Sequence, residues 1–436
     1  MKKRWLILAA LLPLLGACVY DFEAELTGDE YTVVVEGDIL IGGTTTLRFS
    51  RLNPEVMKSQ DVDLSSFLSS SGDLSSSRIS SSSSWSFPVD FTATVEGEDG
   101  SVVQARGISG LCTLNTQNLD PNVRYRLLLL DEQNGDKYST PWQQVMAAPV
   151  VDSLSFNNKE SSLDIQITFH SDGSTPYYCL VYDEQWEYHA YTTTYMRYIP
   201  QGAAEPEKGY VVFPDPETGW GDRYGRIFEV NEPYPNYTCW DKSISGVSSV
   251  VTTGAMVSNK LVDYVVKTLL PDDRKTSVAY RPIVSMRMIS KESFAYWESL
   301  DKASSQTGDL FSPIPSLLRG NLTNEDNPDA HVIGYVGVSQ QVVADRLIKA
   351  SEIEFYRQPS EIWEMLRKAS IGWGAAGGVS AVQMKSQYSL GNRPWRLELP
   401  DTDQEDAEAF YVWIPEYCMD CRKQGGTTTK PADWPE

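Results

Sequence analysis

The cysteines are the residues whose type and spacing could support chemistry most directly. The chain has 6 cysteines, and Cys418 and Cys421 are separated by only two residues. A pair with this spacing could act as a redox dithiol, but the strand-to-helix setting of a thioredoxin-type site is missing here. We therefore expect a structural disulfide, either within the pair or between the pair and Cys239. Zinc binding is disfavoured because no second closely spaced cysteine pair is present.

Sequence motifs typical of enzymes are missing. The chain has no His-Glu-x-x-His zinc motif, no phosphate-binding loop and no Gly-x-Ser-x-Gly elbow. The 3 histidines, His170, His189 and His331, share no ligand spacing, so we expect half-buried strand residues rather than bases or ligands. The sequence therefore predicts no catalytic residue, no metal site and no cofactor.

Two other segments can be interpreted either as a ligand-binding site or as an ordinary structural segment. Residues 372–377 match the glycine spacing of a dinucleotide-binding loop, but a helix is expected before them where that fold needs a strand. We predict a glycine hinge there. The acidic residues between Asp401 and Glu408 could gather calcium, but they lack the glycine and the spacing of a calcium loop. We predict a solvated acidic segment.

The N-terminal residues predict export and lipid attachment. Lys2, Lys3 and Arg4 precede an apolar run, and Leu15-Gly16-Ala17-Cys18 ends it. This order is typical of a secretory signal, and the run is too short to span a membrane as a helix. It also resembles the lipobox of bacterial lipoproteins, which implies a signal peptide at 1–17, lipid on Cys18 and a tether at 18–30. An ordinary cleaved signal with an unrelated cysteine is the alternative.

The charge of the chain bears on its partners. The formal net charge is −22, and the signal peptide removes only basic residues, so the mature chain is more negative still. Such a body is repelled by nucleic acid and by anionic lipid surfaces. We therefore expect no nucleic-acid partner and contact with the membrane only through the anchor. The lipobox resemblance, together with the acidic residues Asp21, Glu23 and Glu25, which resemble the export signals of surface lipoproteins, implies an outer-membrane location with the body either periplasmic or surface-exposed.

Aromatic residues are concentrated in one region of the sequence. Sixteen of them lie between Tyr177 and Trp240. Tyrosine and tryptophan combine a rigid apolar face with one polar group, which suits ligand stacking and partner anchoring. The plainer interpretation is that most of them pack onto their own sheet. The residues that we predict for a ligand or partner surface are Trp186, Tyr188, Trp220, Tyr224 and Trp240.

Residues 31–149 predict a β-sandwich domain. Short runs rich in β-branched residues alternate with turn residues, which is typical of antiparallel sheets. One segment interrupts the pattern, because thirteen of the twenty residues from Ser65 to Ser84 are serine. So little apolar surface cannot offset the entropy of chain ordering, and we predict a mobile serine-rich loop at 64–84.

Residues 150–436 predict a second β-rich domain with a few helices. Leu163, Ile165, Ile167 and Phe169 alternate with polar residues as in a half-buried strand, and 177–188 is predicted as the neighbouring strand. Residues 199–240 have many Pro and Gly and no periodicity, which predicts a long irregular connection. Ser290 is predicted to cap a helix that ends near Ser304, and Ser360 to cap another.

Several segments in order resemble domain-of-unknown-function family 4249, a family of envelope lipoproteins of Bacteroidota. The serine-rich loop departs from the family pattern, and so do Cys112 and Cys179. The segments that carry the resemblance are 33–37, 151–154, 290–297, 315–321, 333–339, 418–421, Gly425-Gly426, Lys430-Pro431 and Trp434.

The resemblance implies a fold and a set of partners. The expected fold is mainly β: an immunoglobulin-like or carboxypeptidase-regulatory-like β-sandwich followed by a second β-rich domain. The expected function is that of a non-enzymatic accessory protein that captures or delivers a ligand beside a TonB-dependent outer-membrane transporter. An adhesin or structural envelope lipoprotein is the main alternative. A hydrolase with an acid pair that the sequence does not reveal is the third.

Overall fold

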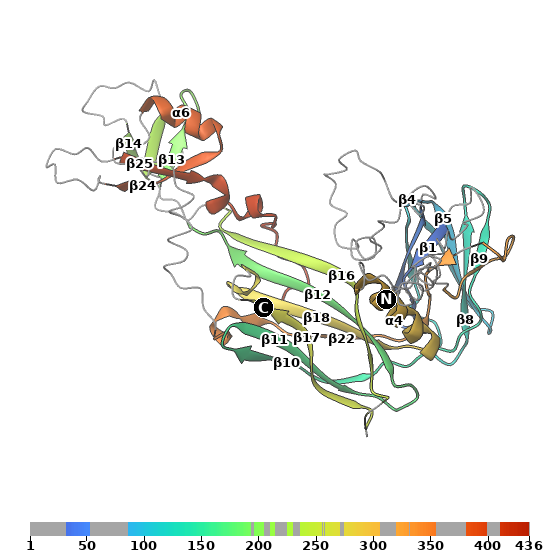
Figure 1. The fold of residues 1–436 in the computed structure, drawn as a ribbon. Coiled ribbons are helices and arrows are strands. Elements are labelled where there is room, and N and C mark those ends of the chain that lie inside the picture. Colours follow the sequence, from blue (N-terminus) through green and yellow to red (C-terminus); the bar gives the residue numbers. More distant parts are fainter. Residues whose placement is uncertain are drawn as a thin grey trace, which may run out of the picture.

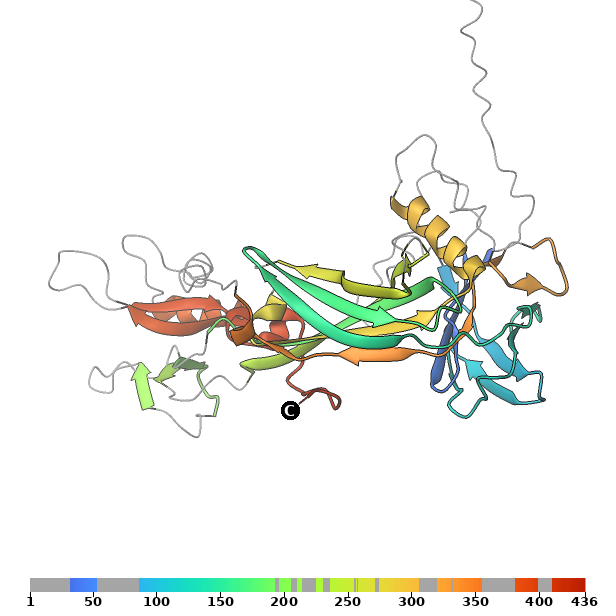
Figure 2. The same cartoon turned by 90° about the horizontal axis from the view of Figure 1, so that it is seen from below.

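The chain forms three parts in a row: a first sandwich, a central sandwich and a distal lobe (Figures 1 and 2). The first sandwich and the distal lobe lie at opposite ends of the central sandwich. This computed structural model describes residues 32–52, 86–192, 196–204, 210–213, 225–229, 236–254, 256, 258–270, 274–305, 320–330, 332–354, 381–398 and 410–435.

The first sandwich encloses a core of alternating strand residues. In strand β5, Phe91, Ala93 and Val95 are all 0% exposed while the residues between them are half-buried, as a two-residue period requires. Phe49 lies in the other sheet and packs against Phe91 across the core, with 5.1 Å between the two ring centroids. The strands are β1 (Thr32–Glu36), β3 (Thr44–Leu52), β4 (Ser86–Pro88) and β7 (Leu111–Asn115) in one sheet, β5 (Phe91–Gly97), β6 (Val102–Gly107), β8 (Tyr125–Asp131) and β9 (Lys137–Ser139) in the other, and β2 (Ile39–Leu40) in a separate pair.

A distant segment completes the first sandwich. Residues 320–339 return from the second half of the chain and add β19 (Thr323–Asn324), β20 (Val332–Ile333) and β21 (Val338–Ser339). Strand β20 pairs in parallel with β1, β21 pairs in parallel with β2, and β19 pairs with β9. The predicted division at 149/150 is therefore incomplete. The longer strands on either side of this division were predicted from their local patterns. Strands β19, β20 and β21 have only two residues each, so they show no periodicity from which their long-range pairing could be predicted.

The central sandwich begins at the predicted boundary, with strand β10 at Val150. One sheet holds three strands and the other holds four strands and a short fifth (Figure 1). The strands are β10 (Val150–Lys159), β11 (Ser162–His170) and β17 (Lys260–Leu269) in the first sheet, and β16 (Thr238–Thr252), β12 (Tyr177–His189), β18 (Ala279–Met288), β22 (Val342–Asp345) and β23 (Ile348–Lys349) in the second.

One strand pairing predicted from sequence is wrong. Strand β12 does not pair with β11 but lies in the opposite sheet, between β16 and β18. The two strands face each other across the core, where the rings of Phe169 and Tyr178 meet edge to face at 4.9 Å. The apolar pattern of the two strands was read correctly, but it describes a shared core equally well for neighbours in one sheet and for partners across two.

Helix α4 (Lys291–Ser305) confirms the helix predicted after Ser290. The Ser290 hydroxyl accepts a hydrogen bond from the Ser293 backbone N–H at 3.1 Å, which is the N-cap interaction. The helix predicted after Ser360 lies outside the described residues. No helix in the described part of the chain has both the length and the apolar character needed to cross a membrane.

The distal lobe replaces much of the irregular connection that we predicted between residues 199 and 240. Short strands from this region pack against a hairpin and a helix from near the C-terminus, around Trp413, which is 0% exposed. The prediction missed them because each strand spans only four residues. The elements are β13 (Met196–Ile199), β14 (Tyr210–Phe213), β15 (Arg226–Glu229), α6 (Ala381–Ser389), β24 (Asn392–Glu398) and β25 (Phe410–Pro415).

The fold is mainly β, with β-sandwich domains and few helices, as the sequence predicted. Short 3-10 turns complete the described elements. They are η3 (Arg274–Thr276), η5 (Ala350–Glu352), η6 (Glu416–Cys418) and η7 (Cys421–Gln424).

Candidate functional site

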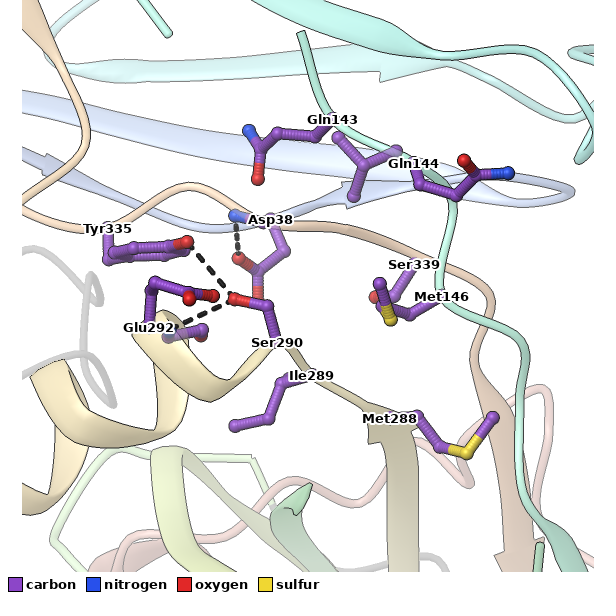
Figure 3. Close-up of a pocket in the computed structure, with 13 residues that line it drawn as sticks. Asp38, Gln143, Gln144, Met146, Met288, Ile289, Ser290, Glu292, Tyr335 and Ser339 are labelled. Atoms are coloured by element: carbon purple, nitrogen blue, oxygen red, sulfur yellow. Dashed lines mark hydrogen bonds between the residues drawn. The ribbon is translucent and has the colours of Figure 1, made fainter. Parts of the chain in front are cut away.

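A cavity of about 200 Å³ lies where the first sandwich meets the central sandwich and helix α4. We call it the junction cavity (Figure 3). Asp38, the 143–146 segment and the 335–339 segment line it from the first sandwich. The turn from β18 into α4, residues 288–293, lines it from the central sandwich.

The wall from the first sandwich is held by hydrogen bonds to the backbone of residues 336 and 337. The Gly337 N–H donates to Oδ1 of Asp38 at 2.6 Å, and the Ile39 N–H donates to the Gly337 carbonyl at 2.9 Å. The Asn321 side chain both donates to and accepts from the backbone of Val336, at 2.8 and 2.9 Å. These contacts fix the returning segment, so this wall does not depend on side-chain packing alone.

A buried ion pair joins the two sandwiches beside the cavity. Asp38 Oδ2 and an Arg287 guanidinium nitrogen lie 2.6 Å apart, and the two side chains are 5% and 8% exposed. Arg287 lies on β18 opposite Cys179 of β12. Burial raises the pKa of the Cys179 thiol to about 11, so Cys179 stays protonated at neutral pH and is a poor nucleophile. Arg287 neutralises the Asp38 charge, which leaves hydroxyl groups, amide groups and the Glu292 carboxylate as the polar groups of the junction cavity.

The start of α4 presents hydroxyls to the junction cavity. The hydroxyls of Ser290 and Tyr335 lie 3.2 Å apart (Figure 3). Burial is the main cause of the raised pKa of Tyr335, so its phenol stays protonated and neutral near pH 7. Ser293 and Ser339 also line the cavity, but their hydroxyl oxygens are buried from it and have no hydrogen-bond partner among the described residues.

A second polar cluster is buried in the central sandwich. The Glu184 carboxylate, which is on a residue only 5% exposed, accepts a hydrogen bond from Tyr280 at 2.5 Å and pairs with Lys275. Burial raises the pKa of Tyr280 far above its usual value, with Tyr182 and Glu184 adding to the shift. Each group in the cluster has a protein partner, so we interpret it as a structural network.

The predicted aromatic surface is wrong for Trp186 and Tyr188. Trp186 and Tyr188 are 5% and 0% exposed and belong to the core of the central sandwich. The Tyr188 hydroxyl donates to the Cys421 carbonyl at 2.8 Å, so its polar end is used inside the protein. Trp240 is half-buried, and Trp220 and Tyr224 lie outside the described residues. The plainer interpretation, packing onto the sheet, is correct for Trp186 and Tyr188.

The cysteines have separate roles. Cys239 and Cys421 form a disulfide, which is one of the pairings that the sequence left open. Cys418 is a buried free thiol whose pKa is raised by burial to about 11, so it is a poor nucleophile at neutral pH. A redox role for Cys418 and Cys421 therefore finds no support. Cys18 and the serine-rich loop at 64–84 lie outside the described residues.

The described residues contain no group of three His, Cys, Asp or Glu side chains placed to hold a metal ion. His170 forms a surface contact with Asp152, with 2.9 Å between Nδ1 and Oδ1. His189 stacks on Tyr237, and burial lowers the pKa of its imidazole. His331, the 372–377 glycines and the 401–408 acids lie outside the described part of the chain.

The comparison with known families decides the classification. Residues 19–344 match the model of a domain of unknown function, DUF4249. The chain belongs to this family. None of the curated proteins matches the sequence. Three of the DUF4249 segments quoted above, 33–37, 290–297 and 333–339, meet at the junction cavity or directly beside it.

The comparison with solved structures matched the chain to a two-domain fibronectin type III segment of chicken tenascin. It is 10% identical, the match covers 59% of this chain and 91% of that chain, and the TM-score is 0.15. With so low a score, the description of the fold rests on the strand order of this chain itself.

The sequence reasoning did not identify the junction cavity. Asp38 and Ser339 follow ordinary strand residues and carry no motif of their own. The available signal was indirect: Ser290 was recognised as a helix cap, and segments 290–297 and 333–339 both carried the family resemblance. Asking which resembling segments come together in space would have found the site, but the pairing of 320–339 with the N-terminal strands is not visible in one sequence.

Proposed function

We propose that this DUF4249 chain is a non-enzymatic lipoprotein of the outer membrane that captures or delivers a ligand beside a TonB-dependent transporter. The observation that carries this proposal is the junction cavity, a small site formed jointly by two sandwiches and lined by hydroxyl and amide groups, the carboxylates of Asp38 and Glu292, and apolar side chains. Such a site suits binding better than bond cleavage, because the groups that line it offer hydrogen bonds but no activated nucleophile.

The signal-like N-terminus supports the anchor in this proposal. The basic start, the apolar run and Leu15-Gly16-Ala17-Cys18 would place lipid on the Cys18 sulfur and on the amine released by cleavage. Each buried methylene contributes roughly 0.8 kcal/mol, so several acyl chains hold a protein firmly.

Labelled palmitate is expected to enter the wild-type protein and to be absent from Cys18→Ala. The variant lacks the sulfur that takes the lipid, and its body has no other predicted membrane contact. Fractionation after labelling is the measurement. A Cys18→Ala protein that stays in the membrane fraction at the wild-type level would contradict the anchor.

Gene deletion distinguishes the proposed transport role from the alternative role as a surface adhesin or structural envelope protein. Loss of a transport accessory should reduce growth on limiting nutrients that enter through TonB-dependent transporters, while attachment to surfaces is unchanged. Loss of an adhesin should have the opposite effect. Complementation with the wild-type gene, beside the Cys18→Ala gene as the matched control, ties either result to the anchored protein.

A further inference from the structure

Two short linkers connect the first sandwich to the central sandwich. The first runs from Met146 to Val150, where β10 begins. The second runs from Ser339 in β21 to Val342, where β22 begins. Short linkers are the usual place for a hinge between domains, because a few residues can absorb the change in backbone angles. Whether the two sandwiches move against each other therefore depends on what holds these two backbones.

The backbones of the two linkers are hydrogen-bonded to each other. The Met146 N–H donates to the Val338 carbonyl at 2.9 Å, and the Gln340 N–H donates to the Met146 carbonyl at 2.7 Å. Together these bonds form a parallel β-bridge between Met146 and Ser339, which we call the linker bridge. A bend at either linker would pull these groups apart, so the residues placed to form a hinge are bound to one another.

The linker bridge also continues the hydrogen bonding of the first sandwich. Gln143 exchanges two backbone hydrogen bonds with Tyr125 of β8, both at 2.9 Å, and its side-chain amide donates to the Val336 carbonyl at 2.9 Å. The Ser339 carbonyl accepts a hydrogen bond from the Ile41 N–H at 2.9 Å. Both linkers are therefore fixed to the first sandwich up to the point where they meet.

Helix α4 makes a second connection across the same boundary. The ring of Phe294 packs on Tyr177 of β12 in the central sandwich, with 4.7 Å between the centroids. The ring of Tyr296, which is only 7% exposed, lies 5.9 Å from that of Tyr335 in the segment that completes the first sandwich. Movement of one sandwich against the other would separate the helix from one of these contacts, as well as breaking the buried ion pair described above.

We propose that the linker bridge locks the first and central sandwiches into one rigid body, so that the chain binds its ligand without closing one sandwich on the other. Domains within a chain move relative to each other by default unless their interface prevents it. Here the interface includes the hinge positions themselves. The inference rests on the proposed function only because it takes the chain as a ligand-capture protein. The junction cavity, which both sandwiches line, then keeps its volume of about 200 Å³.

Distances between pairs of spin labels on the full-length chain in detergent test the rigidity. The sandwich-to-sandwich pair is Val102→Cys in the first sandwich with Val262→Cys in the central sandwich, at side chains 61% and 62% exposed. The reference pair is Val262→Cys with Val343→Cys, both in the central sandwich, and it gives the width that the labels alone produce. The native cysteines in the described residues are buried or disulfide-bonded, and wild type taken through the labelling shows any background.

Electron–electron double resonance should give one distance distribution for the sandwich-to-sandwich pair, as narrow as that of the reference pair. A distribution that is split, or broader than the reference, would show that the sandwiches move and would overturn the proposal.

Proline variants test whether the linker bridge is the cause. Met146→Pro with Gln340→Pro removes both donors of the bridge, because proline has no N–H. The sandwich-to-sandwich distribution should then broaden, while the reference pair stays narrow and reports an intact central sandwich. Ala147→Pro is the control, because it places proline in the same linker without removing an N–H of the bridge. Broadening in the control, or none in the double variant, would refute the assignment to the linker bridge.

Amide hydrogen exchange of the wild type gives a second measurement that needs no substitution. The Met146 and Gln340 amides should be protected as strongly as those of β5, because they exchange only when the joint opens. Exchange more than about a hundredfold faster than in β5 would mean that the linkers open on their own, contrary to the proposal.

These results are separable from the test of the proposed function. Rigidity is measured on the purified chain, whereas the transporter partnership is measured by co-purification from membranes. A chain that recovers a transporter but shows split distances would keep the proposed function and lose the rigid joint, and the reverse result would do the opposite.

Discussion

Replacing Arg287 with methionine is expected to lower the free energy of unfolding by about 3–5 kcal/mol, the cost of leaving one charge of a buried ion pair alone. Asp38 is buried beside Arg287, so its carboxylate would lose its counter-ion without gaining water. Because the pair joins the two sandwiches, the loss should also loosen their junction. Urea denaturation followed by circular dichroism measures the change.

The double variant Asp38→Asn with Arg287→Met is the informative partner experiment. Asparagine keeps an oxygen for the Gly337 N–H and removes the uncompensated charge, so much of the lost stability should return. Arg124→Met is the surface control. Arg124 and Glu98 also form an ion pair, but the side chains are 51% and 38% exposed, and a change below about 1 kcal/mol is expected. Equal losses in Arg287→Met and Arg124→Met would refute the role of burial.

Removing the Cys239–Cys421 disulfide should cost about 2–5 kcal/mol of stability. The two cysteines are 182 residues apart in sequence, so the bond removes a large loop-closure entropy from the unfolded chain. It also attaches the C-terminal segment to the start of β16 in the central sandwich. The double variant Cys239→Ala with Cys421→Ala, compared with wild type under oxidising conditions, provides the measurement.

Cys418→Ala is the matched control for the disulfide. Cys418 is a buried free thiol three positions from Cys421, so its removal leaves the cross-link intact and should cost far less than the double variant. Reducing agent should destabilise the wild type and leave the double variant unchanged. Peptide mapping that finds Cys418 joined to Cys421, or finds Cys239 alkylated in the oxidised protein, would be incompatible with the pairing.

Local pattern was sufficient for much of the fold. The alternation of Phe91, Ala93 and Val95 and of Leu163, Ile165 and Ile167 predicted strands, because residues on one face of a strand recur with a period of two. The N-cap at Ser290 predicted a helix from chemistry within three residues. Local pattern does not show which strands pair with each other. For this reason β12 was assigned to the wrong sheet and residues 320–339 to the wrong domain.

The same limit explains the errors at the candidate site. Trp186 and Tyr188 have the residue types of a binding surface, but the β12 strand turns them into the core of the central sandwich, and one sequence does not distinguish these outcomes. The junction cavity depends on Asp38, Ser293 and Ser339 meeting from three separate segments. None of these residues has unusual chemistry on its own, and only the tertiary arrangement makes the group polar, buried and partly unpaired.

Co-purification from native membranes tests the central claim of a transporter accessory most directly. A tagged wild-type chain would be extracted in mild detergent and its partners identified by mass spectrometry, with Cys18→Ala as the unanchored control. The account predicts that the wild type recovers a TonB-dependent β-barrel receptor in near-stoichiometric amounts and that Cys18→Ala recovers much less. Recovery of no such receptor with the anchored wild type would contradict it.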